Sequence, residues 1–150
     1  MNRARNAILF ASALVALALA TVPAASAQLP YAEGTVQRIV HVRILPGHAA
    51  AFYADFKANS IPLFEAEKSA GLIVSYRTFL NLTANSTEDW DFGYAIVYQN
   101  MAALDGIGDK IYPLRMKHYG DPTAEQKVLD KRYENAHLVA SFLIRDITIR

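Results

Sequence analysis

Residues 35–56 read TVQRIVHVRILPGHAAAFYADF, and two different periodicities meet within them. The first half alternates between aliphatic residues and a mixed set, which is typical of a strand with one buried side. Pro46-Gly47 ends this strand, which is predicted over Thr35–Leu45. In the second half, Phe52 and Phe56 are four residues apart, a spacing that places both side chains on one side of a helix.

The rest of the chain extends this alternation of strand and helix. Gln28–Gly34 is predicted to be a linker. The later elements are predicted as a helix over His48–Asn59 with a break near Ser60 and Pro62, and strands over Leu72–Leu82 and Trp90–Tyr98 joined by a polar turn at residues 85–89. A broken helix is predicted from its cap at Asn100 to Gly120, with a restart at Pro113. Asp121-Pro122-Thr123 is typical of a helix start, and it precedes a helix over Ala124–Asn135 and a strand over Leu138–Ile149. The order βαββαβ predicts an α+β, ferredoxin-like fold: one antiparallel sheet with its helices on a single face.

The strand over Trp90–Tyr98 places its aromatic residues on one face. The residues of that face are Trp90, Phe92, Tyr94, Ile96 and Tyr98. If such a face were the uncovered side of the sheet, it would need a partner, and a second copy of the same sheet is the commonest one. The sequence therefore favours a homodimer.

The chain begins with the features of a secretory signal peptide. Arg3 and Arg5 form a positive region, an apolar run follows, and Ala25-Ser26-Ala27 is a small-x-small cleavage site. We expect cleavage after Ala27, which leaves a single domain over residues 28–150 without a stable membrane anchor. The expected location is periplasmic or secreted.

Cleavage also changes the charge of the protein. The full chain has 15 basic and 14 acidic residues, and loss of Arg3 and Arg5 leaves 13 basic residues and a net charge of −1. No basic block remains, which argues against nucleic acid as a partner. The chain has no Cys, which excludes thiol catalysis and Cys-ligated metal sites.

Three of the predicted strands offer side chains that suit an anionic, planar organic ligand. Arginine binds carboxylate or phenolate groups through two hydrogen bonds and stacks on rings, and histidine can act as a general base near neutral pH. The candidate ligand-binding residues are His41, Arg43, Ser75, Arg77, Trp90 and Tyr94, provided that the last two project to the same side as the others. The alternative is that this face is a dimer interface whose His41 and Arg43 bond to acids across it.

A second group of candidates lies in the broken helical region. Tyr112, Met116, His118 and Tyr119 contain the residue types of a haem or metal site, although a lone helical His is more often a surface or capping residue. No spacing matches a zinc-protease, nucleophile-elbow, P-loop or dinucleotide motif. The sequence therefore predicts no cofactor and no metal site, and leaves open whether the protein is an enzyme.

The segment VRILPGHAAAFYADF, residues 42–56, together with Trp90 at the start of the third strand, resembles the dimeric α+β barrel superfamily. This group includes antibiotic-biosynthesis monooxygenase-like and NIPSNAP-like domains. The resemblance implies a homodimer whose two sheets enclose a barrel, with ligands between sheet and helices or inside the barrel. Members include cofactor-independent oxygenases, haem-degrading enzymes, haem-dependent chlorite-converting enzymes and many proteins without a known activity.

Three functions follow as hypotheses. The first is an exported protein that binds a small aromatic or anionic molecule in the cell envelope. The second is a cofactor-independent monooxygenase-like enzyme that acts on an aromatic substrate, and the third is a haem-binding protein. Because reduced nicotinamide, flavin and ATP are not expected outside the inner membrane, the exported address favours chemistry that needs none of them.

Overall fold

The computed structural model describes residues 29–84, 86 and 89–150. The predicted signal peptide and part of the predicted turn at 85–89 lie outside these residues. The strands are β1 (Tyr31–Ile44), β2 (Ser75–Leu80), β3 (Phe92–Tyr98) and β4 (Ala136–Ile149). The helices are α1 (Ala49–Asp55), α2 (Ile61–Ser69), α3 (Ile107–Tyr119) and α4 (Pro122–Tyr133), with a π-helical turn at Phe56–Ser60 and a 3₁₀ turn at Met101–Leu104.

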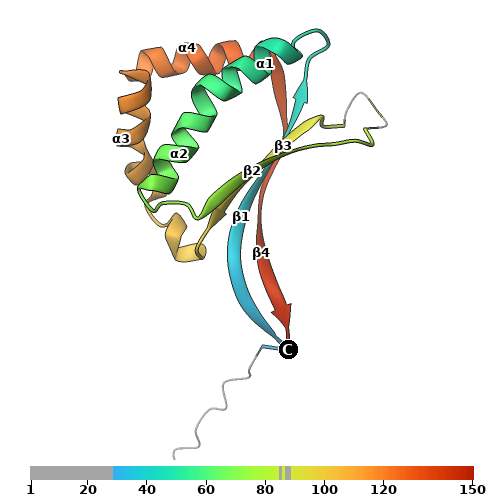
Figure 1. Cartoon of the computed structure of the whole chain (residues 1–150), viewed down its shortest axis with the longest axis vertical. Coiled ribbons are helices and arrows are strands. Elements are labelled where there is room, and N and C mark those ends of the chain that lie inside the picture. Colours follow the sequence, from blue (N-terminus) through green and yellow to red (C-terminus); the bar gives the residue numbers. More distant parts are fainter. Residues whose placement is uncertain (1–28, 85, 87–88) are drawn as a thin grey trace, which may run out of the picture.

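The four strands form one antiparallel sheet in the order β2-β3-β1-β4. Figure 1 shows the helices gathered on one side of this sheet. The element order and the strand order together define the ferredoxin-like α+β fold, which confirms the predicted fold class.

The core lies between the sheet and the helices. Alternation along β1 sends Val36 and Ile44 toward the helices, and both are buried there. Phe52 and Phe56 meet them from the helical side, and burial of one such side chain stabilises the fold by about 1.5–3 kcal/mol. The aromatic face of β3 belongs to the same core. The condition under which this face would need a partner is therefore not met, because the protein's own helices cover it.

The predicted break near Ser60 is a π-helical turn inside an otherwise continuous helical segment. Ser60 has helical backbone angles and makes no side-chain cap. Phe52, Phe56 and Phe64 all face the core, although steps of four residues drift around an α-helix of 3.6 residues per turn. A π turn accommodates one extra residue, and it returns Phe64 to the side of the helix that carries the first two phenylalanines.

The second helical layer is more regular than predicted. α3 continues through Pro113 without a restart, and Gly120 ends it at a φ of 90°, a value that favours glycine. The two predicted helix starts are correct. Asn100 accepts a hydrogen bond from the Ala103 amide at 3.1 Å, and Asp121 accepts one from the Ala124 amide at 2.9 Å.

β1 and β4 are both longer than predicted, and most of the predicted linker belongs to β1. Residues 31–33 pair with residues 147–149, beyond the last pairing of β1 with β3 at Val36 and Tyr98. We call this two-stranded extension the arm; it projects from the body in Figure 1. Arg145 and Glu33 form an ion pair next to it. β2 and β3 are shorter than predicted, and Trp90 precedes β3.

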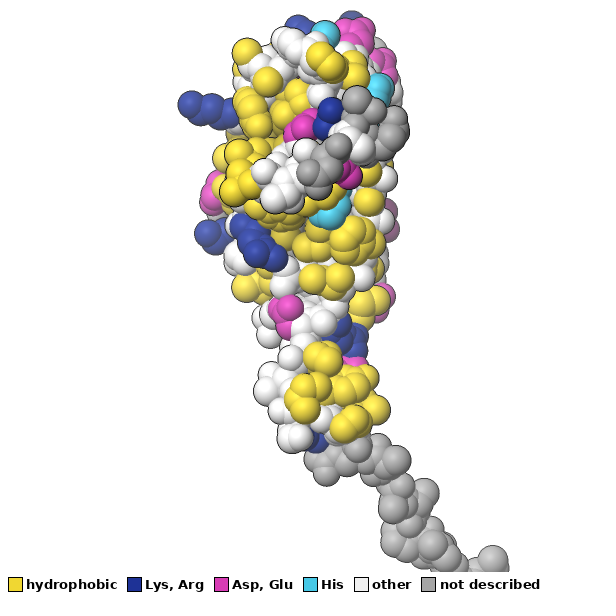
Figure 2. All heavy atoms as spheres, turned by 90° about the vertical axis from the view of Figure 1, so that its right-hand side faces the viewer, with side chains coloured by type: hydrophobic (Ala, Val, Ile, Leu, Met, Phe, Trp, Pro, Cys, Tyr) yellow, Lys and Arg dark blue, Asp and Glu magenta, His cyan; other side chains and the backbone are white. Residues whose placement is uncertain are grey.

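The face of the sheet away from the helices, which we call the open face, is partly apolar. Figure 2 shows hydrophobic side chains gathered on it and again on the arm. Ala95 is inaccessible there, whereas Phe142 and Ile144 are about two-fifths exposed, at 43% and 40%. In the described part of the chain, no helix combines the length and the apolar character needed to cross a membrane.

Candidate ligand-binding site

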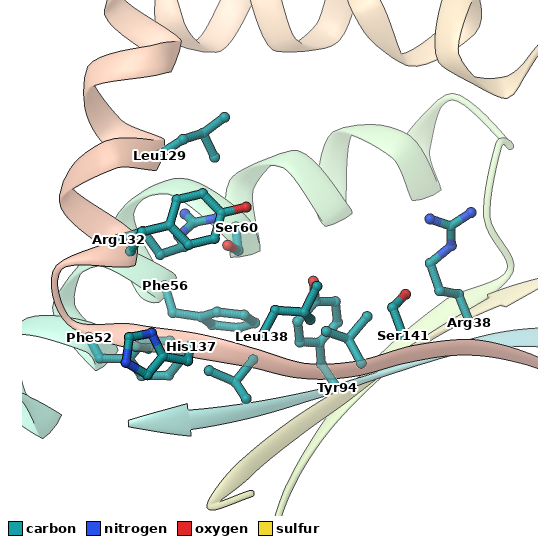
Figure 3. A pocket seen from close by; sticks show the side chains of 14 residues that line it. Arg38, Phe52, Phe56, Ser60, Tyr94, Leu129, Arg132, His137, Leu138 and Ser141 are labelled. Atoms are coloured by element: carbon teal, nitrogen blue, oxygen red, sulfur yellow. The ribbon is translucent and has the colours of Figure 1, made fainter. Parts of the chain in front are cut away.

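A cavity of about 210 Å³ lies between the sheet and the helices (Figure 3). Most of its wall is aliphatic or aromatic, and its polar groups come from a few side chains. The lining residues are Arg38, Val40, Val42, Phe52, Phe56, Ser60, Tyr94, Leu129, Arg132, Tyr133, Ala136, His137, Leu138 and Ser141. None of these described residues is acidic, so the charged groups in the wall are cationic.

The sheet and the helices each supply one part of the wall. On β1, Val40 and Val42 line the cavity because alternation directs them toward the helices. Phe52 and Phe56 reach it from α1 and the π-helical turn. α4 contributes Leu129, Arg132 and Tyr133. Arg132 and Tyr133 lie three and four residues after Leu129, so all three are on one side of the helix.

Arg132 lines this site and carries one buried nitrogen without a hydrogen-bond partner, while burial raises the pKa of Tyr119 and a hydrogen bond from the Arg132 guanidinium opposes this rise. Its Nε donates to Asp55 Oδ2 at 2.6 Å, which joins α4 to α1. Its Nη2 is buried and has no hydrogen-bond partner among the described residues. An unpaired buried donor costs about 1–3 kcal/mol, and more when the group is charged. A ligand acceptor that reaches this nitrogen from the cavity would remove this cost.

Tyr94 adds a second donor. Its hydroxyl points from β3 into the cavity (Figure 3) and makes no hydrogen bond with the described residues. Burial raises the pKa of Tyr94, and the positive charges of Arg132 and Arg38 oppose this rise. The phenol therefore stays protonated at neutral pH, and it can donate a hydrogen bond to an anion. Both guanidinium groups are therefore close enough to the Tyr94 hydroxyl to lower its pKa.

Arg38 lines the other end of the cavity. It lies on β1 opposite Ile96 of β3 and Leu143 of β4, and its residue is exposed. Within the described residues, its side chain makes neither a hydrogen bond nor an ion pair. Figure 3 shows Arg38 and Arg132 at opposite ends of the cavity, with Tyr94 and Ser141 between them.

The structure does not bring the six sequence-predicted site residues together. His41 pairs with Gly93 and Val40 pairs with Tyr94; because paired residues share a face, Tyr94 lies on the helix side and His41 on the open face. By the alternation of side chains along each strand, Arg43, Ser75 and Arg77 also point to the open face. The condition that Tyr94 projects with His41 and Arg43 was wrong, because the register of β3 is set by the burial of its aromatic face.

The open-face residues have local partners. Arg43 Nη1 donates to Asp91 Oδ1 at 2.9 Å and to the Asp89 carbonyl at 3.0 Å, so it holds the end of the β2–β3 hairpin. Arg77 Nη2 donates to Gln37 Oε1 at 3.2 Å. The ion pair of Arg43 with Asp91 is within one chain, whereas the alternative prediction placed the acids across a dimer interface. The half-buried Ser75 makes no side-chain hydrogen bond within the described residues.

His41 and Trp90 meet on the open face even though Trp90 lies outside β3. Their rings are stacked, with centroids 4.1 Å apart, and Phe79 and Phe142 present edges to the imidazole. Burial lowers the pKa of His41, which keeps the ring neutral at physiological pH. This cluster makes an aromatic surface and does not line the cavity described above.

The side chains of the second predicted group do not all line one site. Its His118 Nε2 lies 3.3 Å from Asn59 Oδ1, and its ring packs edge-on against Tyr119. His118 also lines a cavity of about 230 Å³ between α2 and α3, from which Tyr112 and Met116 are absent. In residues 29–84, 86 and 89–150, no group of three or more His, Cys, Asp or Glu side chains is placed to hold a metal ion.

Sequence reasoning missed Arg38, Arg132 and His137. The sequence does carry a signal for Arg38. Its side chain lies on the same side of the strand as Val36 and Val40, so it is a charged residue on the buried face. Arg132 follows Leu129 and Glu125 at helical spacing, but only the packing of α4 shows that this side faces the sheet. His137 is the second residue of β4 and lines the cavity from there.

No family model matches the chain, and no curated protein matches it. Among solved structures, it is similar to HapK from Hahella chejuensis, with a TM-score of 0.47 and 15% identity over 74% of this chain and 91% of that one. It is also similar to a dimeric protein of unknown function and ferredoxin-like fold from Bacteroides fragilis, with a TM-score of 0.41 and 12% identity over 75% of this chain and 95% of that one. A third similar structure is a dimeric ferredoxin-like protein from an uncultured marine organism, with a TM-score of 0.46 and 10% identity over 79% of this chain and 98% of that one. These likenesses assign no activity, ligand or partner to this chain.

Proposed function

We propose that this protein binds a small aromatic anion in the cavity between its sheet and its helices. The observation that carries the proposal is the buried Arg132 Nη2, which has no partner among the described residues although its side chain lines the cavity. A ligand carboxylate is the acceptor that a guanidinium group binds best. The proposal keeps the predicted class of ligand and moves the site from the open face to the helix face.

The size and the lining of the cavity support a ligand with one ring. A dry, engineered cavity of about 150 Å³ binds benzene, and this cavity measures about 210 Å³. Phe52, Phe56 and Leu138 offer apolar surface to a ring. The Tyr94 hydroxyl and the Arg132 guanidinium offer donors to an anionic substituent, and no described lining residue repels it by negative charge.

The test is calorimetric titration with benzoate, with benzamide as the neutral analogue of similar shape. We expect benzoate to bind more tightly than benzamide. In Arg132→Lys, which keeps the charge but removes the fork, benzoate affinity falls about tenfold or more, because a hydrogen bond to a charged group is worth about 1.5–3 kcal/mol.

The matched control for this titration is Arg115→Lys. Arg115 also uses its Nε to bind a carboxylate, that of Glu125 at 2.5 Å, but it does not line the cavity. Benzoate affinity should be unchanged in this variant. Equal binding of benzoate to the wild type and to Arg132→Lys would overturn the proposal.

A homodimer formed through the open face is part of the same proposal. The face carries Phe142 and Ile144, both substantially exposed, and the aromatic cluster around His41. The arm adds Ile147 and Ile149, which are 50% and 72% exposed. Exposed apolar patches of this kind mark an interaction site, and a self-complementary two-fold interface is the commonest way to cover them.

The cellular location remains a proposal that rests on residues 1–27 of the sequence. If the leader is cleaved after Ala27, the protein acts in the periplasm or outside the cell. N-terminal sequencing of the protein recovered from the extracellular or periplasmic fraction tests this. We expect the mature chain to start at Gln28, and a chain that retains Arg3 and Arg5 in that fraction would contradict cleavage.

The cofactor-independent oxygenase remains the second candidate. It is favoured by one observation: Tyr94 and His137, a donor and a potential base, line the same apolar cavity. Oxygen uptake in the presence of a bound phenol, lost in Tyr94→Phe and His137→Gln, would make the protein an enzyme. The haem hypothesis remains a prediction, and haem titration followed by absorbance spectroscopy tests it.

A further inference from the structure

We propose that the cavity selects aromatic ligands with a second anionic group, which Arg38 binds at the end away from Arg132. This inference rests on the proposed function, because it assumes that an aromatic anion occupies the cavity. It narrows the ligand class from aromatic monoanions to aromatic dianions such as benzene dicarboxylates.

The first support is the position of Arg38 on the sheet. It lies in β1, between β3 and β4, at a parity that otherwise carries Val36, Val40 and Val42. An arginine at such a position would normally pair with a carboxylate. Within the described residues, Arg38 has no hydrogen bond or ion pair through its side chain, and no acidic residue is among the described residues that line the cavity.

The second support is the length of the cavity. Arg38, Val40 and Val42 all line it, so it extends from residue 38 to residue 42 of β1, four steps that cover about 13 Å along a strand. Arg132 and Arg38 lie at its opposite ends, and the space between them is bordered by Tyr94 and Ser141 (Figure 3). An apolar middle with a guanidinium at each end matches a rigid ring that carries an anionic group on opposite sides.

The third support is the difference between the two arginines. Arg132 lines the cavity, is tied to Asp55 at 2.6 Å and has a buried unpaired nitrogen, so it offers a guanidinium group held in place at that end. Arg38 is exposed and unpaired within the described part of the chain, so its charge is available to a ligand group at the other end of the cavity. A ligand would therefore be anchored at the Arg132 end and selected at the Arg38 end.

The experiment compares terephthalate with benzoate by calorimetric titration of the full-length mature chain. Terephthalate should bind about two- to fivefold more tightly than benzoate, the range expected for an ion pair that is partly exposed to solvent. In Arg38→Gln, the ratio of the two affinities should fall to about one. High salt should reduce the ratio in the wild type, because an exposed charge pair is screened.

The control for Arg38→Gln is Arg145→Gln. Arg145 lies opposite Val36 in β4 and binds Glu33 near the arm, outside the cavity. Its replacement should leave the ratio of terephthalate to benzoate affinity at the wild-type value. A circular dichroism spectrum of each variant verifies that the fold is retained.

The outcomes separate this inference from the proposed function. If benzoate binds but terephthalate binds no more tightly, or if the preference survives in Arg38→Gln, the inference is wrong and the proposed function stands. If neither anion binds the wild type, both are wrong. Terephthalate binding that depends on Arg38 without detectable benzoate binding would support the inference.

Discussion

The imidazole of His41 stacks on the indole of Trp90, with ring centroids 4.1 Å apart and planes within 8° of parallel. Phe79 and Phe142 contact the imidazole edge-on, with centroids at 6.2 and 5.5 Å. The four rings come from β1, β2, β4 and the segment before β3. The cluster therefore crosses the open face from one edge of the sheet to the other, and it holds a titratable group at its centre.

The first prediction concerns the pH dependence of stability. Burial lowers the pKa of His41 below its ordinary 6.5. The unfolded chain then binds more protons than the folded one, so the contribution of His41 is fully present above pH 6.5 and is lost as the pH falls through the lowered pKa. Thermal unfolding between pH 5 and 8 should show a smaller acid-side loss of Tm in His41→Gln than in the wild type. Identical pH profiles would contradict this.

The second prediction concerns the homodimer. Phe142→Asp places a charge on the open face, and the protein should become monomeric in light scattering after size exclusion. A charge buried at an interface without a partner is strongly unfavourable. Tyr112→Asp is the control, because Tyr112 is 50% exposed on α3, away from the open face. The interface is misplaced if Phe142→Asp remains a dimer at the same concentration as the wild type.

The third prediction concerns a buried carboxylate. Glu67 of α2 is 6% exposed, and burial raises its pKa, an effect that the positive charge of Arg115 opposes. The folded state therefore binds more protons than the unfolded one, and the contribution of Glu67 is greatest below pH 4.5 and is lost as the pH rises through the raised pKa. Glu67→Gln should raise Tm at pH 7, and this gain should shrink toward pH 4.

The control for the third prediction is Glu134→Gln, at an exposed residue after α4. A neutral substitution there should move Tm little at either pH, since surface substitutions usually change stability by less than about 0.5 kcal/mol. A destabilised Glu67→Gln at pH 7 would mean that the charged carboxylate contributes more to the fold than its burial costs.

The fourth prediction concerns Gly93 on β3. A Cβ atom at this position would lie 2.3 Å from Cε2 of Phe79, whose ring covers the glycine. Gly93→Ala should therefore destabilise the protein by about 1–3 kcal/mol, the range for overpacked sites, as measured by urea denaturation. If this contact is the cause, Gly93→Ala should cost much less in a Phe79→Ala background. Additive effects of the two substitutions on the free energy of unfolding would show that contact with the Phe79 ring is not the cause.

Much of the fold follows from local signals in the sequence. The alternation of Val36 to Ile44 predicts β1, and Asn100 and Asp121 predict two helix starts, because each of these signals depends on residues close together in the chain. The π-helical turn and the passage of α3 through Pro113 could not be predicted in this way. Both depend on packing against other elements, which can outweigh the local preference to end a helix.

The candidate site shows the same division. The types of residue that suit an anionic ligand were predicted, and Tyr94 was among them, but the face on which each one lies was not. The reason is the period of two in a strand: one change of register moves a side chain to the opposite face. Arg132 was missed because its contribution depends on Asp55, 77 residues away in the sequence.

The arm brings the two ends of the described chain together. The amide of Arg150 donates to the carbonyl of Pro30 at 3.0 Å, and Tyr31 pairs with Ile149. A force applied between these ends would pull in the unzipping geometry, in which the hydrogen bonds of β1 and β4 break one after another. In the shear geometry they would all bear the load at once. The domain should therefore yield at low force when it is pulled by its ends, with the arm opening before the cavity does.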